Sequence, residues 1–136
     1  MRFDTKIAVV VSDDLPPWQK LNVACFLAGG LVGAQGELAG EAYQDASGRL
    51  YGPLIRQPVL VFAAAPAEIK TALARAVERG VTVSIYTREL FATGNDVDNR
   101  AAVRAVPTDR LDLVGLALHA PRRDVDKITR GLALHS

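Results

Sequence analysis

The sequence has a single cysteine, few aromatic residues, almost no excess of charge and no hydrophobic run of membrane length. One cysteine, Cys25, among 136 residues excludes an intrachain disulfide framework and favours a reducing compartment, so we expect a cytoplasmic protein. The formal net charge of +1 predicts no strong global attraction to nucleic acid or to an anionic membrane. The uncharged run from Leu21 to Ala34 is shorter than the roughly 20 residues that span a bilayer. GxGxxG and phosphate-loop patterns are absent from the sequence, so we expect no nucleotide cofactor.

The sequence does contain alternating apolar runs and helical patterns, which are typical of one globular domain over residues 1–136. Continuously apolar, β-branched runs predict buried strands at residues 6–12, 58–65, 81–87 and 112–120. Apolar residues at helical spacing, each time with a proline at the start of the segment, predict helices at residues 17–35, 66–80 and 121–132. This order predicts a three-layer α/β/α domain with a mixed, mostly parallel sheet of about four strands. The turn-rich residues 36–57 are expected to form a long connection with room for one turn of helix.

Lys20 is the first candidate for a functional residue, because it stands alone at the start of the most apolar helix. A lysine near the positive end of a helix is disfavoured unless an acid or a ligand balances its charge. Asp13 and Asp14 follow the first strand and are placed to do so, at the sheet edge where ligands of open α/β sheets collect. We therefore expect Asp13 and Lys20 to share a hollow at that edge. The alternatives are a surface lysine lying over Trp18 and an aspartate that only caps the helix.

Further polar candidates interrupt the apolar helix or follow the third strand. Asn22 breaks the apolar pattern, and its amide must find either a ligand or a backbone partner. The segment Tyr86 to Arg100 opens onto the same sheet edge, where its alternative is a polar loop with a short helix. Its candidate side chains are those of Thr87, Arg88, Glu89, Thr93 and Asn95. The predicted ligand-binding set is Asp13, Lys20, Asn22, Thr87, Arg88 and Thr93.

Other residues that often carry chemistry are expected to be structural here. Cys25 has no histidine nearby in the sequence and is expected to be an inert core thiol. His119 and His135 lack the neighbouring cysteines or acids of a zinc site. The stretch "NDVDN", residues 95–99, lacks the glycine and the final glutamate of a calcium loop. We therefore predict no metal site.

Several local patterns resemble those of the type II peptidyl-tRNA hydrolases. In that family a strand ends in an Asp, a loop leads to a catalytic lysine, and a small-residue helix carries a Cys; Asp13, Lys20 and Cys25 occupy the matching positions. "ALARAVERGVTVSIY" resembles the helix and strand before the family's catalytic loop, and "GLALHAPRRDVDKITRGLAL" resembles its closing strand and helix. The resemblance covers residues 6–134 and is greatest to an uncharacterised bacterial branch, a domain of unknown function (DUF2000-like). It implies a peptidyl-tRNA hydrolase II-like fold.

Three departures from the family pattern concern the reaction. The Gly/Lys loop is replaced by "LPPWQ", the helix histidine position falls on Leu27, and Thr87 stands where a loop Asp is expected. Glu89 or Thr93 substitutes for that Asp only if the backbone is rerouted. The resemblance therefore implies the fold without the reaction.

Three functions remain open at this point. The first is a small-ligand-binding or regulatory module, which the missing His and Asp favour. The second is a divergent hydrolase of an ester or amide, peptidyl- or aminoacyl-tRNA included, in which Lys20 stabilises the oxyanion while Asp13 or Glu89 positions water. The third is a homodimeric interaction protein that pairs through Gly29 and Gly33 of the apolar helix. RNA stays open as a partner because arginines are present, although acids are interleaved with them: Arg100, Arg104, Arg110, Arg122, Arg123 and Arg130.

Overall fold

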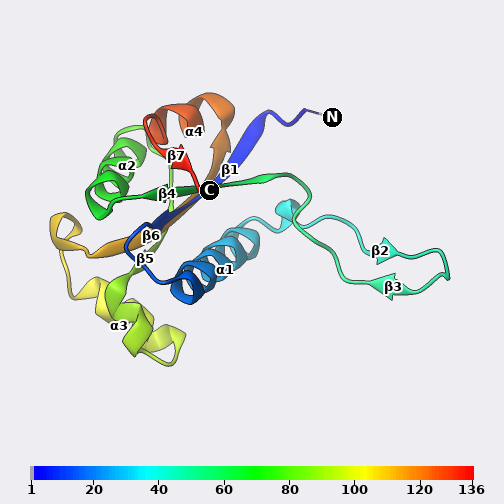
Figure 1. Ribbon diagram of the computed structural model, residues 1–136, viewed down its shortest axis with the longest axis horizontal. Helices are drawn as coiled ribbons and strands as arrows, with labels where there is room; N and C mark the ends of the chain where they lie inside the picture. The colour runs from blue at the N-terminus through cyan, green and yellow to red at the C-terminus, as the bar shows by residue number, and fades with distance from the viewer. Residues whose placement is uncertain (1) are drawn as a thin grey trace.

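The computed structural model describes residues 2–136 and has three layers, a sheet with helices on both faces (Figure 1). The five strands lie in the order β5-β6-β1-β4-β7. Helix α1 covers one face, and helices α2 and α4 cover the other. The strands of this sheet are β1 (Thr5–Ser12), β4 (Val59–Ala64), β5 (Ser84–Thr87), β6 (Leu113–Pro121) and β7 (Ala133–Leu134). The helices are α1 (Pro17–Ala34), α2 (Pro66–Glu78), α3 (Asp96–Arg104) and α4 (Arg122–Ile128).

The central strand β1 is buried on both faces, which explains its unbroken apolar sequence. Ile7 and Val9 point to the core under α1, whereas Ala8 and Val10 point to the core under α2 and α4. All four side chains are at most 1% exposed. A strand with helices on both sides needs apolar residues at every position, as predicted for residues 6–12.

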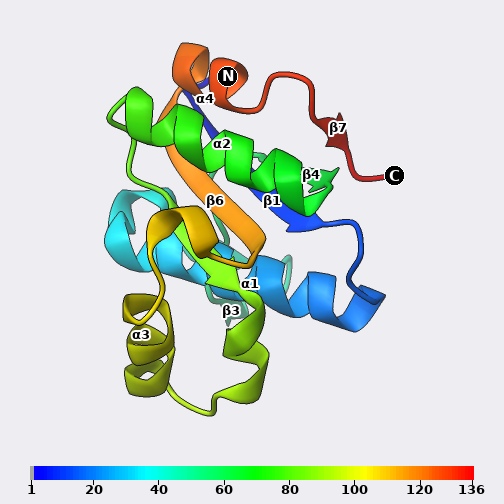
Figure 2. The same ribbon diagram turned by 90° about the vertical axis from the view of Figure 1, so that its left-hand side faces the viewer.

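The sheet is mixed, but the expectation that it is mostly parallel was wrong. One neighbouring pair, β1 with β4, is parallel; β1 with β6, β5 with β6 and β4 with β7 are antiparallel. The reason lies in residues 88–112, which stay at the end of the sheet where β5 finishes instead of crossing back over a face (Figure 2). Strand β6 therefore begins at that end and runs against β5 and β1.

Both long helices begin at the prolines that the sequence suggested. Pro17 and Pro66 occupy the first helical turn of α1 and α2, where the missing N–H costs nothing. The carboxylate of Glu68 accepts a hydrogen bond of 2.9 Å from the backbone N–H of Ala65 and so secures the start of α2. Gly80, at φ +69°, ends the turn after α2 in a conformation that favours glycine.

Residues 36–57 contain more structure than expected. A 3-10 helix, η1 (Gly36–Leu38), is the predicted single turn, but a two-stranded hairpin follows it: β2 (Tyr43–Gln44) and β3 (Leu50–Tyr51). The hairpin extends away from the body of the molecule (Figure 1). Two more 3-10 helices, η2 (Arg88–Ala92) and η3 (Thr108–Arg110), flank α3. No helix within residues 2–136 has both the length and the apolarity needed to cross a membrane.

Candidate functional site

The structure divides the predicted site residues among three places. Arg88 lies in an ion-pair network at the end of β5, and Lys20 lies beside the C-terminal segment. Asn22 and Thr93 line a cleft between α1 and α3. The hollow expected between Asp13 and Lys20 stays a prediction, and each of these groups has contacts of its own.

Arg88 bridges two aspartates from neighbouring strand ends. Its guanidinium lies 3.1 Å from Asp14 Oδ2 and 3.1 Å from Asp112 Oδ2. The hydroxyl of Ser12, which is fully buried, also donates to Asp14 Oδ1 at 2.6 Å. This hydroxyl, followed by the Arg88 charge, lowers the pKa of Asp14. Burial works to lower the pKa of Arg88, but the two carboxylates outweigh it and raise that pKa. The charges of Arg88, Asp14 and Asp112 are thus balanced within this group, which indicates that it joins the ends of β1 and β6.

Lys20 is balanced by neither of the acids that precede its helix. Its ammonium lies 3.3 Å from Nε2 of His135, in the segment that follows β7. The backbone N–H of His135 donates to the carbonyl of Val61 at 2.8 Å, which holds this segment against β4. The lysine therefore contacts the C-terminus of the chain, a partner 115 positions away in sequence.

The remaining candidates form no hydrogen bond or ion pair with Lys20 within the described residues. Asp13 is exposed, and its backbone N–H donates to the carbonyl of Ala64 at 2.9 Å. Thr87 is 2% exposed within the sheet, and Glu89 is exposed in the first turn of η2. Within the described residues, no ion pair joins Lys20 to Asp13 or to Glu89. The structure thus does not assemble a lysine–carboxylate pair at the sheet edge.

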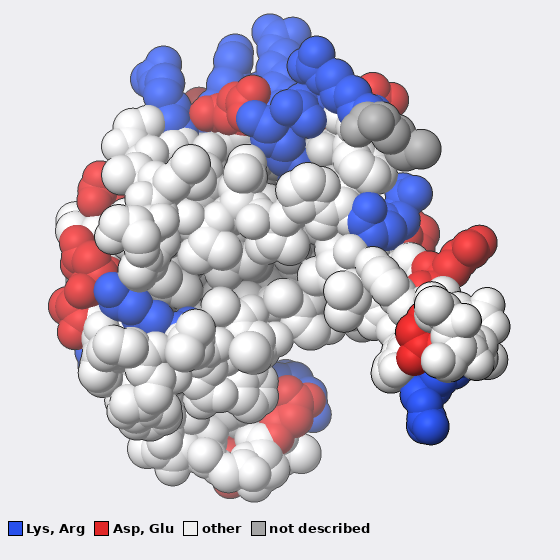
Figure 3. Space-filling view, turned by 45° about the vertical axis from the view of Figure 1, so that its right-hand side comes forward, with Lys and Arg blue, Asp and Glu red and all other residues white. Residues whose placement is uncertain are grey.

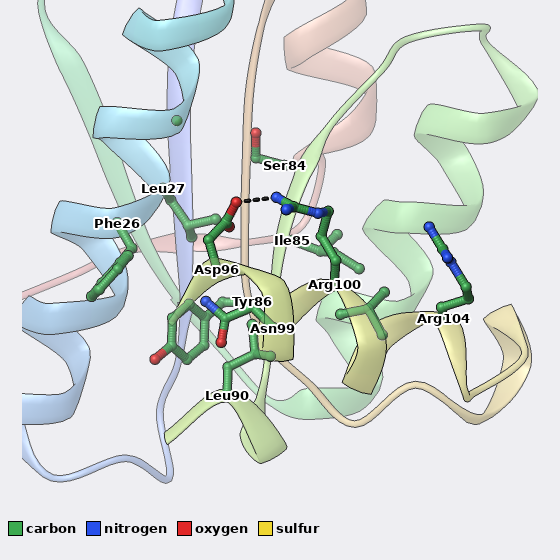
Figure 4. A pocket seen from close by; sticks show the side chains of 12 residues that line it. Phe26, Leu27, Ser84, Ile85, Tyr86, Leu90, Asp96, Asn99, Arg100 and Arg104 are labelled. Carbon is green, nitrogen blue, oxygen red and sulfur yellow. Dashed lines mark hydrogen bonds and ion pairs between the residues drawn. The ribbon is translucent and has the colours of Figure 1, made fainter. Parts of the chain in front are cut away.

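A cleft between α1 and α3, with β5 as its floor, combines aromatic, polar and charged side chains and is the candidate site (Figure 4). It consists of two adjoining hollows of ≈ 540 Å³ and ≈ 310 Å³. Neither Asp13 nor Lys20 is among the residues that line them. The two hollows share Phe26, Tyr86, Leu90, Asp96 and Asn99.

Four of the chain's eight aromatic residues form one wall of this cleft. Ring centroids lie 6.1 Å apart for Trp18 and Phe91, 5.1 Å for Phe91 and Tyr86, and 5.9 Å for Tyr86 and Phe26. These separations are typical of favourable aromatic pairs. Trp18 and Phe26 are nonetheless 61% and 57% exposed, so their outer ring faces stay open to a further planar group.

Three polar side chains in the cleft have no partner inside the molecule. No described residue hydrogen-bonds the amide of Asn22, the hydroxyl of Ser84 or the hydroxyl of Tyr86. Burial raises the pKa of Tyr86, so its hydroxyl stays protonated at neutral pH and can donate a hydrogen bond. A fourth polar group, Asn99 of α3, lies beside Tyr86 in Figure 4, and its carbonyl oxygen accepts a hydrogen bond from the hydroxyl of Thr93. The cleft therefore offers several hydrogen-bonding groups around an aromatic wall.

The far end of the cleft is charged. Asp96 and Arg100 form an ion pair one turn apart along α3. Arg104, one further turn along, has no acidic partner among residues 2–136. Figure 4 shows Phe26 and Tyr86 at one end and Arg104 at the other, so the cleft runs from an aromatic to a cationic region.

Sequence reasoning missed most of this cleft, because α3 was expected only as the alternative to a binding loop. The helix begins where Asn95 accepts a hydrogen bond of 2.9 Å from the backbone N–H of Asp98, a signal that was legible as a helix cap. The prediction that Cys25 is a core thiol was also wrong, because Cys25 is exposed on α1. Helical spacing places it one turn after Leu21 on the outer face of α1, away from the sheet.

Comparison with known proteins agrees with the fold. The family model described as "Protein of unknown function (DUF2000)" matches residues 5–136. The solved structure of a protein of unknown function, Atu0240, from Agrobacterium tumefaciens strain C58 is 47% identical and has a TM-score of 0.96. The match covers 99% of this chain and 100% of that one. Among curated proteins, none matches this chain. An α/β domain with a five-stranded mixed sheet and four helices, matched over nearly its whole length, thus belongs to the DUF2000 family.

Proposed function

We propose that this protein is a small-ligand-binding or regulatory module, and that it binds a planar ligand carrying an acidic group in the cleft between α1 and α3. One observation carries the proposal: polar side chains without a partner lie in the same cleft as an exposed aromatic wall. Small-molecule sites are typically hollows of about 300–1,000 Å³ lined by apolar side chains and a few convergent polar groups. The larger hollow, at ≈ 540 Å³, lies within that range.

The aromatic wall supports a planar ligand. A flat ring that stacks on Phe26 covers side-chain surface that is now in water, and it approaches the edge of Tyr86 at the same time. Stacked and edge-on pairs contribute about 0.5–1.5 kcal/mol beyond the burial of their area. A branched aliphatic ligand would gain only the free energy of burying its apolar surface, without the contribution of aromatic pairing.

The polar groups support an acid on that ligand. Ser84 and Tyr86 are hydroxyl donors on the floor of the cleft, and Arg104 is a cation at its end. An anionic group that reaches Arg104 finds a partner that no acid of the described chain already occupies. The ligand then satisfies groups that otherwise depend on water, which favours binding.

We infer further that the fold is of the peptidyl-tRNA hydrolase II type and that the protein works in the cytoplasm. The positions of Asp13, Lys20 and Cys25 in the sequence support the fold type. The single cysteine supports a reducing compartment. Neither inference adds a catalytic residue.

The geometry favours binding over a divergent hydrolase. Hydrolysis by Lys20 with Asp13 or Glu89 needs an ammonium and a carboxylate within reach of one bond. Lys20 instead faces His135, and no carboxylate pairs with it among the described residues. Any substrate of such a hydrolase has to lie outside the cleft, because neither hollow is lined by Lys20.

Titration of ¹⁵N-labelled protein with 2-naphthoate, and separately with its neutral isostere 2-naphthamide, tests the proposal. We expect saturable shifts of backbone signals from residues that line the cleft, with tighter binding of the carboxylate. Arg104→Gln should reduce the preference for the carboxylate by about two- to fivefold, because Arg104 is exposed and an exposed ion pair contributes up to about 1 kcal/mol. The matched control is Arg110→Gln, because Arg110 is exposed and lines neither hollow.

Tyr86→Phe separates the hydroxyl from the ring. The ring wall survives this change, so both probes should still bind, each more weakly by the loss of one hydrogen bond. Absence of saturable shifts with either probe, or shifts confined to residues outside the cleft, contradicts the proposal. Equal affinities for naphthoate and naphthamide contradict its anionic part.

A further inference from the structure

We propose that the protein forms a homodimer in which the hairpin arm of each subunit packs on the outer face of α1 of the other. The arm comprises residues 41–54. The outer face of α1 is the exposed side of the helix that carries Trp18, Leu21, Cys25 and Gly29. This face shares Trp18 with the aromatic wall of the cleft, whereas Leu21, Cys25 and Gly29 line neither hollow.

The arm is held in shape by its own turn. The carboxylate of Asp45 accepts hydrogen bonds from the backbone N–H groups of Ser47 and Arg49, at 2.9 and 3.0 Å. The hydroxyl of Tyr51 donates to the same carboxylate at 2.7 Å, and Gly48 takes the left-handed conformation at φ +85°. Hydrogen bonding to Tyr51 and to the backbone lowers the pKa of Asp45. The turn is therefore held in one conformation by its own hydrogen bonds, although its residues are exposed to solvent.

The arm lacks the support that a hairpin of this size needs. Its strands are two residues long, and every residue from 41 to 54 is exposed. A two-stranded hairpin alone in water is at best marginally stable, so an ordered one requires another surface to pack on. The arm also exposes large apolar groups: Tyr43 53%, Leu50 69%, Tyr51 50% and Leu54 63%.

The outer face of α1 is apolar and flat. The helix contains one charged residue, Lys20, and that side chain faces the C-terminal segment. Leu21 is 68% exposed, and a Cβ added at Gly29 or Gly33 would meet nothing within 4 Å. A soluble helix normally turns polar side chains to water. This one presents an apolar stripe, and at Gly29 and Gly33 no side chain hinders close approach.

The exposed apolar area matches what a dimer requires. Six of the ten large apolar side chains exposed among the described residues lie on the arm or on this helix face. With half or more of each exposed, and about 150–250 Å² per aromatic side chain, they present on the order of 700 Å². A standard interface takes about 800 Å² from each partner, whereas the largest apolar patch of a typical monomer is about 300–600 Å². The apolar area of the arm and the helix face together is therefore close to what one subunit contributes to a standard interface.

A second copy is the occupant that uses both surfaces at once. Figure 3 shows a concave, mostly uncharged surface between the body and the arm. About a two-fold axis, each arm covers the partner's helix while its own helix is covered in return, and this closes the assembly at two subunits. A net charge of +1 puts little repulsion between the copies.

Sedimentation velocity over a range of protein concentrations tests the dimer. We expect the wild-type chain to sediment as a dimer at micromolar concentration. Leu50→Glu on the arm and Leu21→Glu on α1 should each raise the dissociation constant at least about tenfold, because each buries an unpaired carboxylate in the interface. The matched control is Val77→Glu, since Val77 is 65% exposed but lies on α2, on the opposite face.

Removal of the arm provides a second variant that does not depend on a buried charge. The backbone N–H of Gly40 donates to the carbonyl of Leu54 at 2.8 Å, and Ala39 is bridged to Ile55. The two ends of the arm are therefore adjacent, so a short turn in place of residues 42–52 should leave the body folded, as circular dichroism checks. This variant should be monomeric.

The native thiol of Cys25 reports on the same face. Its reaction with a maleimide should slow as the wild-type protein dimerises and should proceed freely in Leu50→Glu. A wild-type chain that sediments as a monomer at tens of micromolar overturns the proposal. So does a dimer that Leu21→Glu, Leu50→Glu and removal of the arm all leave intact, because its interface then lies elsewhere.

Discussion

Val23 of α1 lies directly over Gly115 of β6, so close that a Cβ added to Gly115 would come 2.4 Å from Val23 Cγ1. The same Cβ would come 2.9 Å from Leu27 Cδ1. Both are core residues, at 0% and 3% exposure, and the β-branched Val23 has little rotamer freedom within a helix. The helix packs closely on the sheet because this strand position has no side chain.

Gly115→Ala should therefore lower the free energy of unfolding by about 1–3 kcal/mol, the usual cost of overpacking a core. Chemical denaturation measures the change. Gly33→Ala is the control, measured in the Leu50→Glu background so that the proposed dimer does not contribute: nothing lies within 4 Å of its Cβ, so the better helix propensity of alanine should raise stability by up to about 1 kcal/mol. Val23→Ala combined with Gly115→Ala should destabilise less than the sum of the two changes. Additive losses would show that Val23 is not the obstacle.

The sequence predicted the helix starts and the central strand of this fold, because residues close together in the chain determine both. Prolines fix the starts of α1 and α2, and the unbroken apolar run of β1 follows from helices on both of its faces. Strand direction was not legible. A buried strand has the same composition whichever way its neighbour runs, so β6 gave no sign that it lies antiparallel to β1. The two-residue strands β2, β3 and β7 are too short to carry a pattern.

The site was legible only where a polar residue breaks an apolar pattern. Asn22 and Thr93 were selected for that reason or for their place after β5, and both line the cleft. Lys20 was expected to face Asp13, but its observed contact is with His135. No spacing rule connects residues that far apart in the chain. The pairing depends on where the C-terminal segment docks against β4, which is a tertiary property.

Asp14, one of the two aspartates that pair with Arg88, should contribute pH-dependent stability. The pKa of Asp14 lies below its ordinary value of 3.8 in the folded chain, so as pH falls the unfolded chain binds the proton first. The stabilisation is therefore present above that value and is lost as pH falls through the folded pKa. Asp14→Asn should cost less than about 1 kcal/mol at pH 7, because the pair is partly exposed, and should cost almost nothing at pH 2.

Unfolding free energies measured from pH 2 to pH 7 test this expectation. Asp13→Asn is the control at the adjacent position, since Asp13 is exposed and forms no ion pair within the described chain. Its stability curve should parallel that of the wild type. A pH-independent difference for Asp14→Asn would mean that the carboxylate acts through packing and not through its charge.

His119 should be needed for stability, because it joins three elements. Its Nε2 lies 2.8 Å from the hydroxyl of Thr5 on β1, and its Nδ1 is hydrogen-bonded to Oε1 of Gln35 at the end of α1. His119→Leu removes both bonds and leaves the half-buried side-chain carbonyl oxygen of Gln35 without its partner, while Thr5 keeps its bond from Gln57, so the change should cost about 1–3 kcal/mol. His135→Leu, at the exposed end of the chain, should change stability by less than about 0.5 kcal/mol. Equal effects of the two changes in thermal denaturation would contradict a joining role for His119.

Lys20 provides the sharpest separation between binding and hydrolysis. Because it lines neither hollow of the cleft, Lys20→Met should bind 2-naphthoate with an affinity within about twofold of the wild type, a difference of about 0.4 kcal/mol. Asn22→Ala, two residues further along α1 and inside the smaller hollow, should weaken binding of the same probe if that hollow is used. Peptidyl-tRNA and simple esters should be turned over by neither the wild type nor Lys20→Met. Turnover by the wild type that disappears in folded Lys20→Met would establish the hydrolase instead and would place its reaction beside His135.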